Sequence, residues 1–94
     1  MTVRQLLRIF GRVQAVGFRD RVLDIAECYR VAGSVRNLRS GEILEVDAEG
    51  EPAEVERFFA DVLAHPPTFA RVERVERETL APRGASGFSR APTA

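Results

Sequence analysis

Residues 43–49, ILEVDAE, alternate strictly between apolar and acidic side chains after the first position. The apolar members are Leu44, Val46 and Ala48, and the acidic members are Glu45, Asp47 and Glu49. This period of two is typical of a β-strand with one face buried and the other exposed. The preceding SVRNL, residues 34–38, and the turn sequence RSG, residues 39–41, predict a hairpin partner for it. The chain is therefore expected to build a sheet that is covered on one face only.

Helical spacing of apolar residues occurs on both sides of this hairpin. From Phe18 the apolar residues recur at intervals of three and four, and Gly33 predicts that this helix ends just after Ala32. A second helix is expected to begin near Pro52, which suits a first helical turn. Its apolar stripe consists of Val55, Phe58, Phe59, Val62 and Leu63. Two amphipathic helices are thus available to cover one face of the sheet.

Three further segments complete the expected order of elements. VRQLLRIF, residues 3–10, predicts a first strand, and Phe88 is expected in a short edge strand. ARVERVERE, residues 70–78, suits a helix surface as well as a strand, and we assign a strand because the topology needs one after the second helix. The order βαββαβ predicts an α+β ferredoxin-like sandwich, an antiparallel sheet with two helices on one face. We expect a single domain over residues 1–90 and a loose C-terminal tail over residues 91–94.

Charge is unevenly spread along a chain whose net charge is zero. Residues 1–39 hold eight arginines against three acids, a balance of +5, and residues 40–94 hold six arginines against eleven acids. An anionic partner is therefore expected at the first half, whereas nonspecific nucleic-acid binding is disfavoured. One cysteine excludes an internal disulfide, and no signal peptide or membrane-spanning run is visible. We expect a cytoplasmic monomer.

The loop between the first strand and the first helix, GRVQAVGFRD at residues 11–20, is the strongest candidate for a site. Its backbone amides and the positive end of the helix dipole form a ready anion site, and Arg19 would add a fork of donors suited to phosphate. Without an anion, an arginine at this end of a helix is unfavourable by about 0.3–1 kcal/mol. The alternative is that Arg19 is a solvated surface residue. The loop matches neither a P-loop nor a dinucleotide fingerprint.

GRVQAVGFR, residues 11–19, closely resembles the phosphate-binding loop of acylphosphatases, whose pattern is G-x-V-Q-G-V-x-F-R. GSVRNL, residues 33–38, resembles the family's G-x-V-x-N, and it is followed by a turn glycine and a strand that ends in glycine. PPTFARVERV, residues 66–75, resembles the stretch after the second helix. The resemblance extends over residues 3–78 and keeps both functional elements in the family's order.

The resemblance implies hydrolysis of the carboxyl–phosphate bond of small acyl phosphates to a carboxylate and inorganic phosphate, with no metal and no cofactor. Carried over by position, Arg19 binds the phosphate and Asn37 orients the attacking water. The loop amides that would surround the phosphoryl oxygens are those of Gln14, Ala15, Val16, Gly17, Phe18 and Arg19. For Asn37 alone, a role at a strand end before a turn is the competing interpretation.

Two departures from the family pattern leave alternatives open. Ala15 stands where the family has glycine, and a positive φ there would cost about 1–2 kcal/mol. Arg90 falls where an apolar residue is usual. Arg90 bears on local geometry more than on function, whereas Ala15 lies in the loop itself. Ala15 therefore leaves open a catalytically weak or inactive domain that binds phosphate or carbamoyl phosphate, as at the start of larger maturation proteins. An RNA-binding module shares the fold plan, but the acidic face of residues 45–49 is expected to repel phosphate.

Overall fold

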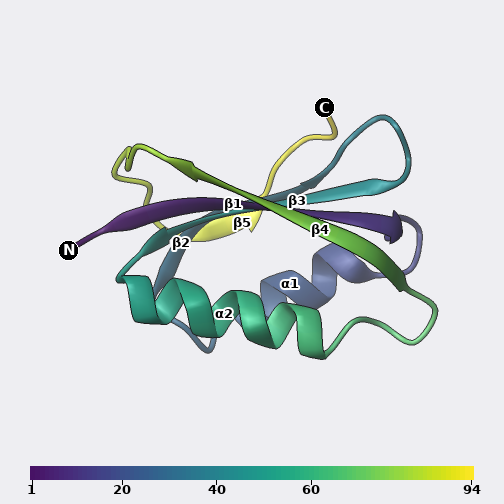
Figure 1. Ribbon diagram of the computed structural model, residues 1–94, viewed down its shortest axis with the longest axis horizontal. Helices are drawn as coiled ribbons and strands as arrows, with labels where there is room; N and C mark the ends of the chain where they lie inside the picture. Colours follow the sequence, from purple (N-terminus) through teal and green to yellow (C-terminus); the bar gives the residue numbers. More distant parts are fainter.

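A computed structural model describes residues 1–94, and its elements follow the order expected from the sequence. They are β1 (Val3–Arg12), α1 (Phe18–Ala26), β2 (Val31–Asn37), β3 (Ile43–Gly50), α2 (Pro52–Ala64), β4 (Arg71–Leu80) and β5 (Phe88–Arg90). The ferredoxin-like prediction is confirmed, with both helices on one face of a five-stranded sheet (Figure 1). The assignment of residues 70–78 as a strand is confirmed as well, because β4 spans most of them.

The strands lie in the order β4-β1-β3-β2-β5. β1 pairs antiparallel with β3 and β4, and β2 forms the antiparallel hairpin with β3. β5 adds a parallel pair with β2, so the sheet is mixed rather than wholly antiparallel. β4 is an edge strand whose side chains are exposed on both faces, which explains why its sequence lacks a clear apolar alternation.

The core lies between the helices and the sheet. All three apolar members of the alternating β3 segment are fully buried, as predicted. Phe58 and Phe59 of α2 and Phe18 of α1 pack against them, and each is 2% exposed or less. Burial of one such side chain contributes about 1.5–3 kcal/mol. Neither helix combines the length and hydropathy that a membrane crossing requires.

The predicted end of the first helix is wrong. α1 ends at Ala26 rather than Ala32, and Gly33 lies inside β2. Gly33 has a φ of 144°, and a Cβ atom there would lie 1.8 Å from the carbonyl oxygen of Asp47 on β3. The glycine is thus required by the close approach of two strands and does not stop a helix.

Residues 91–94 lie along the end of β2. The amide of Ala91 donates to the carbonyl of Val35 at 2.9 Å, and the amide of Ala94 donates to the carbonyl of Asn37 at 3.1 Å. The carbonyl of Ala94 in turn accepts from the amide of Arg39 at 2.6 Å. The segment that we expected to be a loose tail is therefore tied to the sheet by backbone hydrogen bonds.

Candidate active site

The loop between β1 and α1 borders a small hollow of about 200 Å³. Its lining residues are Val13, Gln14, Ala15, Gly17, Phe18, Arg19, Asp20, Asn37 and Arg90. The structure therefore brings together the loop and Asn37, which are separated by a whole helix in the sequence. The volume limits a ligand that fills the hollow to a small group such as a phosphoryl.

The backbone of this loop offers several free hydrogen-bond donors. No backbone carbonyl accepts a hydrogen bond from the amides of residues 14–20. Gly17 is the N-cap of α1, and the first intrahelical bond runs from the amide of Arg21 to its carbonyl at 3.1 Å. Phe18, which is 1% exposed, fixes the start of the helix in the core. The free amides and the helix dipole together create an electropositive concavity.

Ala15 adopts the left-handed conformation that its position in the motif suggested. Its φ is 60°, and it is the only residue other than glycine with a positive φ. Gly17, two residues later, has a φ of 79°. Both residues line the hollow. Because its φ is positive, Ala15 carries the conformational cost of about 1–2 kcal/mol that the sequence comparison predicts for an alanine there.

The two predicted catalytic side chains both border this hollow. Arg19 lies in the first turn of α1 and is half-buried, and no acidic side chain pairs with its guanidinium. Asn37 ends β2, is 7% exposed, and its buried Oδ1 has no hydrogen-bond partner. A buried carbonyl oxygen without a donor costs about 1–3 kcal/mol, so its retention calls for a role outside packing.

Sequence reasoning missed the second guanidinium of this hollow. Arg90 of β5 lines it and forms an ion pair with Asp20 of α1. The only signal in the sequence was a charged residue where the family pattern has an apolar one. The structure accordingly provides one paired and one unpaired arginine at the site.

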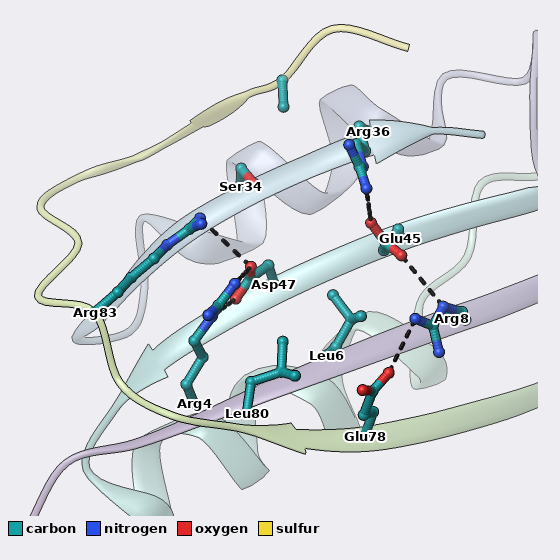
Figure 2. Close-up of a pocket in the computed structure, with 11 residues that line it drawn as sticks. Arg4, Leu6, Arg8, Ser34, Arg36, Glu45, Asp47, Glu78, Leu80 and Arg83 are labelled. Carbon is teal, nitrogen blue, oxygen red and sulfur yellow. Dashed lines mark hydrogen bonds and ion pairs between the residues drawn. The ribbon is translucent and has the colours of Figure 1, made fainter. Parts of the chain in front are cut away.

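A separate hollow of about 390 Å³ lies on the sheet face that the helices leave open (Figure 2). Asp47 receives two hydrogen bonds from Arg4, at 2.8 and 3.0 Å, and Glu45 lies between Arg8 and Arg36. The hydrogen bonds to Asp47 raise the pKa of Arg4, and the hydrogen bond to Glu78 raises the pKa of Arg8.

The prediction that the acidic side chains of residues 45–49 form an exposed face is therefore wrong. Glu45, Asp47 and Glu49 are 6–9% exposed. Arginine side chains pair with Glu45 and Asp47, and the backbone amides of Arg83 and Gly84 donate to Glu49. Every one of these three carboxylates is hydrogen-bonded, so none of them is an unpaired acid on the open face of the sheet.

Metal-ligating side chains do not gather in this chain, since no three His, Cys, Asp or Glu side chains are arranged to hold an ion. His65, the single histidine, is the C-cap of α2, and its Nδ1 lies 2.7 Å from Oδ1 of Asp61. The hydroxyl of Tyr29 donates to the same carboxylate at 2.7 Å. These hydrogen bonds, that of Tyr29 first, lower the pKa of Asp61. They join the end of α2 to the segment after α1.

Comparison with known proteins extends the resemblance to the whole site. The family model described as Acylphosphatase matches residues 5–90. The acylphosphatase of Thermococcus kodakarensis is 45% identical over 86 residues, which is 92% of each chain. Both the loop and β2 lie within the range that the family model matches.

Two solved structures are similar throughout this chain. The crystal structure of acylphosphatase from Bacillus subtilis gives a TM-score of 0.86 at 29% identity and covers 97% of this chain and 99% of the other. Full-length HypF in its phosphate- and nucleotide-bound form gives a TM-score of 0.90 at 29% identity. The match covers 99% of this chain but only 12% of HypF, so the chain spans about one eighth of that larger protein.

Proposed function

Because this chain belongs to the acylphosphatase family, we propose that it hydrolyses the carboxyl–phosphate bond of small acyl phosphates without a metal ion. The products are a carboxylate and inorganic phosphate. We further propose that it acts as a cytoplasmic monomer, without a cofactor or a nucleic-acid partner. The observation that carries the proposal is the unpartnered Oδ1 of Asn37 beside a loop of free amides.

The phosphoryl group would be held by the loop. The free amides of residues 14–19 can donate to its oxygens, and the guanidinium of Arg19 supplies two parallel donors of matching geometry. Charge that develops on the transferring phosphoryl is then met by donors that are already in place, which is the main contribution a protein makes to phosphoryl transfer. The absence of an acidic partner leaves the full charge of Arg19 for this task.

Asn37 would orient the attacking water. Its free Oδ1 can accept a hydrogen bond from the water, and its Nδ2 can donate to a phosphoryl oxygen. The water oxygen forms a bond to phosphorus while the bond from phosphorus to the acyl oxygen breaks, and the electron pair leaves with the carboxylate. A carboxylate is a good leaving group, so the reaction needs little general acid catalysis. The proton that the water loses passes to solvent or to the phosphate product.

The first test is the release of inorganic phosphate from benzoyl phosphate in the presence of EDTA. The natural chain, Arg19→Ala and the control Arg57→Ala should be compared, since Arg57 is an exposed arginine of α2 outside the hollow. We expect metal-independent turnover that is lost in Arg19→Ala and kept in Arg57→Ala. Turnover that survives in Arg19→Ala would contradict the role of Arg19, and turnover abolished by EDTA would contradict the metal-free reaction.

The second candidate is a domain that binds phosphate or carbamoyl phosphate but turns it over weakly or not at all. The strained φ of Ala15 and the TM-score of 0.90 to part of phosphate-bound HypF favour it. A folded natural chain that binds inorganic phosphate and carbamoyl phosphate by calorimetry, yet releases no phosphate, would identify this alternative. An RNA-binding module ranks below both, because no aromatic side chain lines the hollow on the open face of the sheet.

A further inference from the structure

Two arginines line the hollow at the loop, and only one of them is used by the proposed reaction. Arg90 lies on the same hollow as Arg19 and Asn37. We infer that Arg90 binds a second anionic group on the acyl part of the substrate, so that the site prefers acyl phosphates whose acyl group carries a carboxylate. This inference rests on the proposed function and names its substrate class.

The fold places Arg90 on the side of the sheet where the proposed chemistry takes place. β5 pairs in parallel with β2, and Arg90 is the register partner of Val35. Phe88, two residues earlier, packs into the core against Phe58 with ring centroids 5.3 Å apart. Residues two apart in a strand share a face, so Arg90 shares the helix-covered face with Phe88. Asn37 lies two residues beyond Val35 on that same face.

The proposed reaction at the phosphoryl group and the proposed binding of the acyl carboxylate take place at different depths in the hollow. Asn37 and Phe18 are 7% and 1% exposed and form the floor, whereas the side chains of Arg90 and Asp20 are 46% and 70% exposed and form the rim. Water held by Asn37 would attack phosphorus from the floor, in line with the leaving oxygen, so the acyl group points away from the floor. The acyl group must therefore leave the hollow past the rim, where the guanidinium of Arg90 can meet a carboxylate.

Asp20 acts as the resident counterion of Arg90. The pair is exposed, and exposed ion pairs are weak and exchange readily. A carboxylate on the acyl group can replace Asp20 on the guanidinium, whereas a neutral acyl group leaves the pair intact. The charges of Arg19, Arg90 and Asp20 sum to a net positive charge at the hollow, which suits a substrate with two anionic ends.

The test uses a matched pair of substrates, 4-carboxybenzoyl phosphate and 4-carbamoylbenzoyl phosphate. They have the same shape, and the para position prevents the carboxylate from attacking its own acyl group. The quantity measured is the ratio of kcat/KM for the charged substrate to that for the neutral one. We expect a ratio of roughly five for the natural chain, which falls toward one in Arg90→Met and in high salt.

Two further variants make this test specific. Arg57→Met removes one positive charge outside the hollow and should keep the ratio of the natural chain, and Asp20→Asn should raise the ratio because the competing carboxylate is gone. A natural ratio of one or below, or a ratio that Arg90→Met leaves unchanged, would overturn the inference.

Binding separates the failure of this inference from the failure of the proposed function. The matched acylphosphonates carry a carbon–phosphorus bond that water does not cleave, and calorimetry can compare their affinities without turnover. Preference for the carboxylated phosphonate that is lost in Arg90→Met would support the role of Arg90 even if no acyl phosphate is hydrolysed. Equal affinity for both phosphonates would overturn it, whatever the hydrolysis assay gives.

Discussion

The side-chain amide of Gln14 donates a hydrogen bond of 2.7 Å from Nε2 to the carbonyl oxygen of Leu38. The same Nε2 donates to the carbonyl of Ile43 at 3.2 Å. These contacts join the loop to the turn between β2 and β3, immediately after Asn37. One side chain thus fixes the distance between the proposed phosphate-binding loop and the residue that is proposed to orient the water.

Gln14→Ala should therefore weaken phosphate binding, although no side-chain atom of Gln14 is proposed to touch phosphate. Two hydrogen bonds of about 1 kcal/mol each hold the loop, and their loss should weaken the inhibition by inorganic phosphate by up to about thirtyfold. Gln14→Glu keeps the shape but replaces the donating NH₂ with a carboxylate oxygen, so it should be at least as impaired. Unchanged inhibition constants in both variants would show that the loop is held by other contacts.

Asn37→Ala should lower kcat with a smaller effect on the affinity for inorganic phosphate. Misplacing the attacking water is expected to reduce kcat by about a hundredfold. The variant also removes a buried oxygen that has no donor, so the free energy of unfolding should stay level or rise by about 1 kcal/mol.

This combination distinguishes a role in the reaction from a role in folding. A structural asparagine would lose stability when truncated, and its loss would affect binding and turnover alike. Urea denaturation of the same protein samples used for kinetics makes the comparison. Parallel losses of kcat, phosphate affinity and stability would contradict the proposed role of Asn37.

The sequence predicted the parts of the fold that depend on periodicity. The alternation at residues 43–49 and the stripe of α2 identified both the buried face and the helix that covers it. The end of α1 was not predictable in the same way, because the close approach of Gly33 to Asp47 appears only once β2 is paired with β3 in register. A glycine required by a tertiary contact looks identical to one that ends a helix.

The site residues also divide into those that a local motif predicts and those that depend on tertiary contacts. Arg19 and Asn37 were predicted from local motifs, and the structure places both on one hollow. Arg90 could not be found from its neighbours in sequence, because its position depends on the parallel pairing of β5 with β2. The burial of Glu45 and Asp47 was missed for a similar reason, since the arginines that cover them come from other strands.

Ala15→Gly should relieve the strain at the centre of the loop. Removing a left-handed alanine gains about 1–2 kcal/mol, and the greater freedom of glycine in the unfolded chain offsets about 0.4–1 kcal/mol of that gain. We expect a small net rise in the free energy of unfolding, with kcat/KM kept or raised. A clear loss of activity in this variant would mean that the loop geometry has adapted to alanine.

Gly33→Ala should be severely destabilising. The new Cβ would overlap the backbone carbonyl of Asp47, and neither strand can move away without breaking the hairpin ladder. Gly41→Ala is the matched control, because Gly41 also has a positive φ, of 84°, but a Cβ there would have no atom within 4 Å.

Urea denaturation separates steric overlap from backbone strain. Backbone strain alone should lower the free energy of unfolding of Gly41→Ala by about 1–2 kcal/mol. The added overlap should lower that of Gly33→Ala by about 3 kcal/mol or more. Equal losses in the two variants would indicate that the strands accommodate the methyl group.

Glu49→Gln should remove part of the acid sensitivity of the fold. Glu49 is 6% exposed, and the backbone amide of Arg83 donates to its Oε1 at 3.1 Å while that of Gly84 donates to Oε2 at 2.8 Å. These hydrogen bonds, with the charge of Arg4, lower the pKa of Glu49 below its ordinary value of 4.5. A carboxyl group whose pKa is lowered by folding stabilises the native state above its unfolded pKa, and this contribution is lost as the pH falls through the folded pKa.

The stability advantage of the natural chain over Glu49→Gln should therefore be constant above a pH of about 5 and shrink steadily below it. Urea denaturation at a series of pH values between 3 and 7, with about half a unit between them, measures this difference. Glu73→Gln, at an exposed position of β4, is the control and should differ little from the natural chain at any pH. A difference for Glu49→Gln that does not change with pH would mean that the carboxylate stabilises the loop after β4 through its shape rather than its charge.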